Sequence, residues 1–305
     1  MKSPGQIMRE LLAAPEILVT PGVYDGFSAR LVERMGFKAA SITGAGLSET
    51  NLGWADLGIM GYEENLRSSA ALAACSRIPL QADGDTGYGN AVNVYFTVQG
   101  FERAGLAGLM IEDQVWPKRC GHLAGKEVIS AEEGVEKIRA AAEARRDPSF
   151  IVKARTDATA IYGVKEAIRR LNLYADAGAD VLLADALMTE KDIATVAKNV
   201  SKPLAVNMGF GLRQRGTTPL LSPRQLQDMG VATVSYPRLL TSAAIQGMKH
   251  ALSALAGQIA TGDVVEREDL QVSFQELNDL MGLNQLKEIE RHFLTGAQLK
   301  KKYGD

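Results

Sequence analysis

The sequence repeats one local pattern four times: a helix-forming segment ends at a glycine, and a short apolar run follows almost at once. The four glycines are Gly36, Gly105, Gly178 and Gly230. Glycine readily adopts the left-handed conformation that closes a helix at its C-terminal end. Each of these glycines therefore predicts a helix stop that leads into a strand.

Eight short runs have the character of strands. They cover residues 17–20, 39–43, 80–85, 108–112, 150–155, 181–185, 203–207 and 233–236. Most are largely apolar along their length, as is typical of parallel strands buried on both faces. Helical segments are expected between them, over residues 62–75, 92–104, 131–145, 164–177, 190–199 and 223–229. A shorter helix is expected after Gly26, and a long one from Leu239 to about Leu255.

Eight strand–helix units over about 250 residues are the signature of a (β/α)8 barrel, the TIM-barrel fold. A doubly wound sheet is the alternative. No G-x-G-x-x-G motif opens a helix after the first strand, which argues against the dinucleotide-binding form of that fold. We therefore expect a catalytic barrel over residues 1–256.

Residues 257–305 depart from this repeat. They begin with a polar stretch, 261–269, and continue with apolar residues at helical spacing, namely Phe274, Leu277, Leu280 and Met281. A second helical segment is expected over residues 286–293. A helix with such an apolar stripe needs a partner surface. Two interpretations are open: the arm contacts another subunit, or its helices pack on their own barrel.

The composition is that of an ordinary globular protein. Of 305 residues, 46% are hydrophobic and 23% are charged, and the formal net charge is −2. Near-neutral charge argues against general nucleic-acid binding. No apolar run approaches the ~20 residues that span a bilayer, and the N-terminal residues lack the apolar core of a signal peptide. With only two cysteines no disulfide framework is expected, so a cytoplasmic location is the simplest.

Polar side chains end almost every predicted strand. In chain order they are Thr43, Asp83, Asp85, Glu112, Arg155, Asp157, Asp185, Asn207 and Tyr236. Barrel enzymes carry out their chemistry at this end of the strands. Asp83, Asp85 and Glu112 form an oxygen-rich set that suits a hard cation such as Mg²⁺. Arg155 can bind a substrate carboxylate in bidentate fashion, although any one of these charges can also belong to a structural ion pair.

The loop Lys118-Arg119-Cys120-Gly121-His122 holds one of the two cysteines and one of the three histidines. A thiol among cationic side chains is expected to have a lowered pKa, which makes it a usable acid, base or nucleophile. A zinc site is the first alternative, but no further Cys or His lies nearby in the sequence to complete it. A buried structural cysteine is the second, and the polarity of the loop argues against it. Near the second strand, the backbone of residues 43–46 can bind carboxylate oxygens.

Four motifs carry a family resemblance: D-G-D-T-G-Y-G-N at 83–90, I-E-D-Q at 111–114, K-R-C-G-H at 118–122 and A-R-T-D at 154–157. Over nearly its whole length the chain resembles the isocitrate lyase and phosphoenolpyruvate mutase superfamily. The K-R-C-G-H loop is similar to that of the carbon–carbon lyases of this superfamily, such as methylisocitrate lyase and 2,3-dimethylmalate lyase. The mutase and phosphonopyruvate hydrolase branches lack the cysteine.

The resemblance implies a bound Mg²⁺, with Mn²⁺ as a possible substitute. Its implied ligands are Asp83 directly, and Asp56, Asp85 and Glu112 through waters. It implies that Cys120 is the acid–base residue on a mobile gating loop. The implied substrate contacts are Arg155, His122, Asn207 and the backbone of Thr43, Gly44 and Ala45, to which we add Lys118, Gly121 and Asp185. It also implies a homotetramer in which the C-terminal helix is exchanged between subunits.

Three departures from the methylisocitrate lyase pattern bear on the substrate. Asp185 stands where the family commonly has Glu, and Leu123 stands where Arg is typical. The segment 208–217, with Arg213 and Arg215, is longer and more basic than that of methylisocitrate lyase. These departures favour a smaller 2-hydroxy dicarboxylate such as a 2-alkylmalate.

The expected reaction is a retro-aldol, or reverse Claisen, cleavage of a 2-hydroxy di- or tricarboxylate into a 2-oxo acid and a carboxylic acid. Arg155 and the loop N–H groups would stabilise the carbanion, and Cys120 would protonate it. The base for the 2-hydroxyl is open between Tyr24 and an acidic strand-end residue. Oxaloacetate hydrolysis or decarboxylation, or a phosphonopyruvate-type reaction, is the alternative on the same scaffold. A ligand-binding barrel without activity is the alternative of another class.

Overall fold

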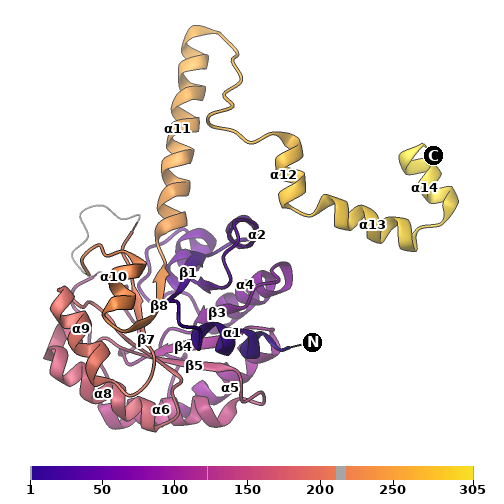
Figure 1. The fold of residues 1–305 in the computed structure, drawn as a ribbon. Helices are drawn as coiled ribbons and strands as arrows, with labels where there is room; N and C mark the ends of the chain where they lie inside the picture. The colour runs from indigo at the N-terminus through magenta and orange to yellow at the C-terminus, as the bar shows by residue number, and fades with distance from the viewer. Residues whose placement is uncertain (1, 122, 211–217, 305) are drawn as a thin grey trace. The chain divides into compact units, whose positions relative to one another are not determined.

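The computed structural model describes residues 2–121, 123–210 and 218–304. In these ranges parallel strands close into a barrel in the order β1 to β8, and β1 pairs with β8 (Figure 1). The strands are β1 (Leu18–Val23), β2 (Ala40–Ile42), β3 (Leu80–Asp83), β4 (Gly108–Glu112), β5 (Ile151–Thr156), β6 (Val181–Ala184), β7 (Leu204–Asn207) and β8 (Val231–Tyr236). Each strand overlaps one of the predicted runs, so the predicted (β/α)8 barrel is confirmed.

Helices surround the barrel (Figure 1). Those of the barrel region are α1 (Pro4–Leu12), α2 (Gly26–Arg34), α3 (Gly44–Leu47), the π-helical turn η1 (Ser48–Leu52), α4 (Tyr62–Cys75), α5 (Ala91–Arg103), α6 (Ala131–Ala144), α7 (Thr159–Tyr162), α8 (Val164–Asp176), α9 (Glu190–Asn199) and α10 (Pro223–Asp228). The C-terminal helices are α11 (Leu239–Thr261), α12 (Phe274–Leu280), α13 (Leu283–Phe293) and α14 (Gly296–Tyr303). The predicted helices agree with these bounds within a few residues at most ends.

The four glycines adopt the backbone conformation that the sequence predicted. Their φ angles are +85° at Gly36, +86° at Gly105, +111° at Gly178 and +91° at Gly230. Each lies two residues beyond the end of a helix, and a strand begins within four residues. Residues with a Cβ rarely adopt positive φ, so glycine at these positions lets the chain turn sharply from the helix into the strand.

Helix α1 was not among the predicted helices, although the sequence carries its start signal. The Ser3 side chain accepts a hydrogen bond from Gln6 N, and Pro4 occupies the first helical turn. Met8 of this helix belongs to an apolar cluster that also contains Leu18, at the start of β1. Arg9 donates to the carbonyl of Ser149 at 3.0 Å. Helix α1 therefore packs at the end of the barrel where the strands begin.

Strand β5 shows how alternation divides the barrel into an inner and an outer face. Val152 and Ala154 belong to the apolar core that strands and helices share. Ile151 belongs to the inner apolar cluster at the start of the strands. Lys153 and Arg155 border the cavity near the other end. Because side chains alternate along a strand, these last two residues point inward together with Ile151.

The chain divides into two compact units, Met1–Ala243 and Ala244–Asp305, and α11 spans the division. No residue of α12, α13 or α14 is buried within the described chain. The domain boundary after residue 256 and the exchange of the arm between subunits stay predictions. In the described ranges, no helix is both long enough and apolar enough to cross a membrane.

Candidate active site

A cavity of about 90 Å³ lies at the carboxyl ends of the strands. It is lined by most of the predicted site residues, which are Thr43, Ala45, Asp56, Asp83, Glu112, Lys118, Cys120, Gly121, Arg155, Asp185 and Asn207. Tyr24, Gly44 and Asp85 are not among the lining residues. His122, like Arg213 and Arg215, lies outside the described residues. The fold thus brings together side chains that are up to 164 positions apart in sequence, from Thr43 to Asn207.

Lys118 is the centre of the acidic part of the site. Its Nζ donates to Asp56 Oδ2 at 2.7 Å. It also lies 2.7 Å from Asp85 Oδ1, an ion pair that lacks hydrogen-bond alignment, since that buried oxygen has no hydrogen-bond donor among the described residues. Burial by itself would lower the pKa of Lys118, but Asp85 and Glu112 raise it well above its usual value. The lysine is therefore a charged partner of the acidic cluster.

The buried carboxylates outnumber what Lys118 can neutralise. Burial raises the pKa of Asp85 to about 7, against the lowering effect of Lys118. Burial likewise raises the pKa of Glu112 well above its usual range, against the lowering effect of Arg155. In both cases burial is the largest cause, and the neighbouring cation only partly offsets it.

Arg155 is held by carboxylates on several sides. Its Nε and Nη2 donate to the two oxygens of Asp157 at 2.8 and 2.9 Å. Nε also lies 3.2 Å from Glu112 Oε2, and Nη2 lies 3.2 Å from Asp185 Oδ2. The guanidinium is therefore fixed in place before any ligand binds, which favours a role in orienting charge.

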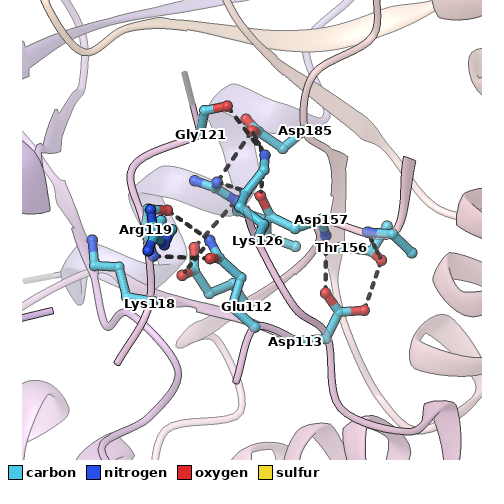
Figure 2. A network of polar contacts seen from close by, with 12 residues as sticks. Glu112, Asp113, Lys118, Arg119, Gly121, Lys126, Thr156, Asp157 and Asp185 are labelled. Carbon is cyan, nitrogen blue, oxygen red and sulfur yellow. Dashed lines mark hydrogen bonds and ion pairs between the residues drawn. The ribbon is translucent and has the colours of Figure 1, made fainter. Parts of the chain in front are cut away.

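Lys126 links the loop that contains Cys120 to the carboxylates around Arg155, as Figure 2 shows. Its Nζ donates to the Gly121 carbonyl at 3.1 Å, to Asp157 Oδ1 at 2.8 Å and to Asp185 Oδ2 at 3.2 Å. Gln114 makes a second link, because its Nε2 donates both to Glu112 Oε1 and to the carbonyl of Arg119, each at 2.9 Å. The loop around Cys120 is thus tied to the strand ends by two side chains.

The Asp113 carboxylate, just after β4, is hydrogen-bonded to the end of β5. Its carboxylate accepts hydrogen bonds from four donors: Thr156 Oγ1 at 2.7 Å, Asp157 N at 2.9 Å, Tyr174 OH at 2.9 Å and Arg170 Nη1 at 3.0 Å. Figure 2 shows this carboxylate beside Thr156 and Asp157. Because Asp157 in turn holds Arg155, the network fixes the position of the guanidinium.

Cys120 borders the cavity from the loop that follows β4. Its backbone N–H donates to the carbonyl of Asp56 at 3.2 Å. Its Sγ accepts a hydrogen bond from Arg238 Nη2 at 3.4 Å, and Arg238 also pairs with Glu49. Arg238 was not among the predicted site residues. Its position just after β8 could have identified it, because residues at the carboxyl ends of barrel strands lie at the active site.

Two predicted residues lie near the cavity without lining it. Tyr24 is half-buried between β1 and α2, and burial, with Asp25, raises the pKa of its hydroxyl. Gly44 begins α3, and a Cβ built on it would lie 2.8 Å from Asp83 Oδ2. Only glycine therefore lets this backbone approach the Asp83 carboxylate so closely. Gln81 and Lys153 also border the cavity, and neither was among the predicted site residues.

The donor set fits a hard divalent cation. The carboxylates of Asp56, Asp83 and Glu112 border one cavity, and Asp85 lies buried beside them. Within the part of the chain that the structure describes, no three Asp, Glu, His or Cys side chains converge as a ready-made metal cage. Mg²⁺ usually keeps several waters and takes one or two carboxylates directly, so such a cage is not required. Burial raises the pKa of Asp85 and of Glu112, and a bound cation would favour the charged form of both carboxylates.

Comparisons with known proteins agree with this geometry. The family model described as phosphoenolpyruvate phosphomutase matches residues 8–256. The chain is 38% identical to 2,3-dimethylmalate lyase of Eubacterium barkeri, over 95% of this chain and 98% of that protein. It is 37% identical to 2-methylisocitrate lyase of Aeropyrum pernix, over 91% of this chain and 88% of that protein.

Solved structures of related enzymes share the fold of this chain. Oxaloacetate acetylhydrolase in complex with 3,3-difluorooxalacetate matches with a TM-score of 0.88 and 33% identity, covering 95% of this chain and 97% of that chain. Phosphonopyruvate hydrolase in complex with oxalate and Mg²⁺ matches with a TM-score of 0.84 and 29% identity, covering 96% and 100%. The sequence-based prediction of an enzyme of the carbon–carbon lyase kind is confirmed by the named relatives. The chain belongs to the phosphoenolpyruvate mutase and isocitrate lyase superfamily.

Proposed function

We propose that this protein is a Mg²⁺-dependent carbon–carbon lyase that cleaves a 2-hydroxy di- or tricarboxylate into a 2-oxo acid and a carboxylic acid. The observation that carries the proposal is the single cavity that combines Asp83 and Glu112, Arg155 and Cys120. This set supplies ligands for a hard cation, a fixed guanidinium and a proton donor. The similarity to 2,3-dimethylmalate lyase and 2-methylisocitrate lyase supports the choice of substrate class.

Asp83 would hold the cation directly, with Asp56, Asp85 and Glu112 acting through waters. When bound, Mg²⁺ supplies Lewis-acid stabilisation of the negative oxygen of the substrate, and Mn²⁺ is a reasonable substitute because it also prefers oxygen ligands. Lys118 bridges Asp56 and Asp85 at 2.7 Å each, so it keeps these two carboxylates in place.

The chain's own groups account for the remaining steps. The substrate hydroxyl loses its proton and the C2–C3 bond breaks. C2 becomes the carbonyl carbon of the 2-oxo acid, and the electron pair of the broken bond passes to C3, next to the carboxylate that C3 bears. Arg155, fixed by Asp157 and Asp185, stabilises this carbon as its enediolate. The thiol of Cys120 then gives its proton to that carbon, which completes the carboxylic acid. The base for the hydroxyl is not assigned, since Tyr24 does not line the cavity.

Oxaloacetate hydrolysis is the second candidate. It is favoured by the similarity in fold and sequence to oxaloacetate acetylhydrolase. The same acidic residues and the same guanidinium would serve an oxaloacetate substrate. A phosphonopyruvate-type reaction and a barrel that binds ligand without turnover are the further alternatives, and both are less suited to a site that keeps Cys120.

The test is a screen of 2-alkylmalates, 2-methylisocitrate, oxaloacetate and phosphonopyruvate with Mg²⁺ and identification of the products. A lyase yields a 2-oxo acid and a carboxylic acid, oxaloacetate hydrolysis yields oxalate and acetate, and decarboxylation releases CO₂. If the protein binds these compounds but turns over none of them, the proposed lyase activity is contradicted.

Substrate size gives a quantitative prediction. We expect kcat/KM for a 2-alkylmalate such as 2,3-dimethylmalate to exceed that for 2-methylisocitrate, because Asp185 and Leu123 replace longer or charged residues that are common in methylisocitrate lyases. Asp185 is also occupied by Arg155 and Lys126. The measurement is steady-state kinetics on both substrates under the same conditions. The reverse order would show that these positions do not set specificity.

We further propose a cytoplasmic homotetramer in which the C-terminal helices are exchanged between subunits. Truncation after Ala260 should then give smaller assemblies with lower stability and lower activity, because it removes the apolar stripe of α12 and leaves the surface that this stripe would cover on a neighbouring subunit exposed. Light scattering measures the size of the assembly. As a matched pair, Phe274→Glu should weaken the assembly, whereas Gln275→Glu, one residue away and off the apolar stripe, should not. An unchanged oligomer after truncation would mean that the arm serves no intersubunit contact.

A further inference from the structure

Lys153 borders the cavity from below the strand ends. It points inward from β5, two residues before Arg155, and its Cα pairs with those of Met110 and Val181 in the neighbouring strands. It is buried, with 6% of its surface exposed. Because alternate residues of a strand face the same side, Lys153 lies one layer deeper in the barrel than Arg155.

The surroundings of Lys153 differ from an ordinary barrel interior, which is filled by bulky branched apolar side chains. Gln81 of β3 and Ser41 of β2 border the same cavity, and Gln81 is 7% exposed. Ser41 donates to Thr20 Oγ1 at 3.1 Å. Among the described residues, neither the Lys153 ammonium nor the Gln81 carboxamide has a hydrogen bond or ion pair.

A buried cation without a protein partner is unfavourable for folding, because the charge has left water and nothing replaces it. Burial lowers the pKa of Lys153 to about 8, although Asp83 acts in the opposite direction. The other cations of the site are differently placed. Lys118 pairs with Asp56 and Asp85, and Arg155 with Asp157. Lys118 and Arg155 would thus meet a ligand while already paired with carboxylates, whereas Lys153 has no ion pair or hydrogen bond to any residue that the structure describes.

We propose that Lys153 and Gln81 form a polar subsite at the floor of the cavity, which binds a carboxylate group of the ligand. An ammonium and an amide N–H₂ are donors, and a carboxylate can accept from both while compensating the buried charge. The identification of this carboxylate with that of the 2-hydroxy acid rests on the proposed function. The subsite itself rests only on the position of the two side chains and on their lack of a hydrogen bond or ion pair within residues 2–121, 123–210 and 218–304.

The test uses oxalate as the probe and isothermal titration calorimetry at saturating Mg²⁺, with the Mg²⁺ affinity of each variant measured separately. Lys153→Met removes the charge while keeping the length of the side chain. We expect oxalate to bind at least about 10-fold more weakly, as for loss of a charge-assisted hydrogen bond in a buried site. The unfolding temperature should be equal to or higher than that of the wild type, because an unpaired buried charge has been removed.

Lys137→Met is the matched control. Lys137 is also a buried lysine, but it donates to the Thr86 carbonyl at 3.0 Å and does not line the cavity. Its replacement should leave oxalate affinity unchanged. Gln81→Met keeps Lys153 and should weaken oxalate binding by a smaller factor, which tests the same subsite independently if Lys153→Met does not fold.

An oxalate affinity within twofold of the wild type in both Lys153→Met and Gln81→Met would overturn the subsite and would mean that Lys153 only balances Asp83. Absence of oxalate binding to the wild type would overturn it as well. Failure of the proposed function is separate. If the wild type cleaves no 2-hydroxy acid but Lys153→Met still loses oxalate, the subsite stands. If the wild type is an active lyase and oxalate binding is unchanged in the variants, only the subsite fails.

Discussion

Asp83→Asn should abolish Mg²⁺-dependent turnover, with a loss in kcat of about 10²-fold or more, because Lewis-acid stabilisation contributes several kcal/mol and each 1.36 kcal/mol is a factor of ten. Asparagine keeps an oxygen that can accept the hydrogen bond from Asp85 N, which measures 3.1 Å to Asp83 Oδ1. The substitution therefore removes charge while retaining shape. The measurement is steady-state kinetics over a range of Mg²⁺ concentrations, together with thermal unfolding.

Chelation of the wild-type protein is the companion experiment. EDTA should stop turnover, and added Mg²⁺ or Mn²⁺ should restore it, because both cations prefer oxygen ligands. For the Asp83→Asn variant, Asp180→Asn is the matched control, since Asp180 is paired with Arg9 and Arg145 and does not line the cavity. Its effect should be confined to stability. Full activity of the wild type in excess EDTA would refute the metal-dependent mechanism.

Cys120→Ser should lower kcat by about 10²-fold or more, the scale of general acid–base catalysis, while the protein remains folded. Serine can still accept the hydrogen bond that Arg238 Nη2 donates to Sγ at 3.4 Å, so the loop should keep its place. The hydroxyl is a far weaker acid than the thiol, and the loss is therefore expected in kcat more than in KM. Kinetics on the preferred substrate of the screen measures both.

Cys75→Ser is the matched control for this prediction. Cys75 is the second cysteine of the chain and lies half-buried on α4, where its thiol donates to the Leu72 carbonyl at 3.4 Å. It does not line the cavity. Its replacement should leave kcat unchanged. A Cys120→Ser variant with near-native kcat would remove Cys120 from the chemistry and leave the rest of the site to be explained by another proton donor.

The two substitutions act on parts of the site that are held differently. Asp83 ends a strand of the barrel, whereas Cys120 lies on a loop that is tied to the strands by Gln114 and Lys126. A charge removed from a rigid strand end changes local electrostatics with little movement. A change in the loop can also alter its position, which is why Cys120→Ser needs thermal unfolding and KM beside kcat.

The local course of the chain was determined by the sequence itself. Glycines such as Gly105 and Gly178 close helices through a backbone conformation that only glycine adopts easily, so they mark the start of the next strand without any knowledge of the fold. The apolar runs then follow from burial on both faces of a parallel sheet. Helix α1 could have been predicted from its capping box at Ser3, which is also a local signal.

The identity of most strand-end residues was also readable, because parallel strands bring their carboxyl ends to one side of the barrel. Arg155 was found in this way, whereas Cys120 was found from the cationic loop that contains it, and both border the cavity. The sequence could not tell how these charges pair. Lys118 was expected to bind substrate, and its predicted role is untested, but the fold sets it between Asp56 and Asp85, which are 62 and 33 positions away in the chain.

Only the tertiary structure decided which groups face one another. Arg238 reaches Cys120 across 118 residues of sequence, and Asp113 gathers donors from α8 and β5. Lys153 illustrates the physical reason most directly. Its inward orientation depends on the strand register, since a shift of one residue would turn it to the helices. Pairing of charges depends on distances between strand ends, and these are fixed by closure of the barrel rather than by local sequence.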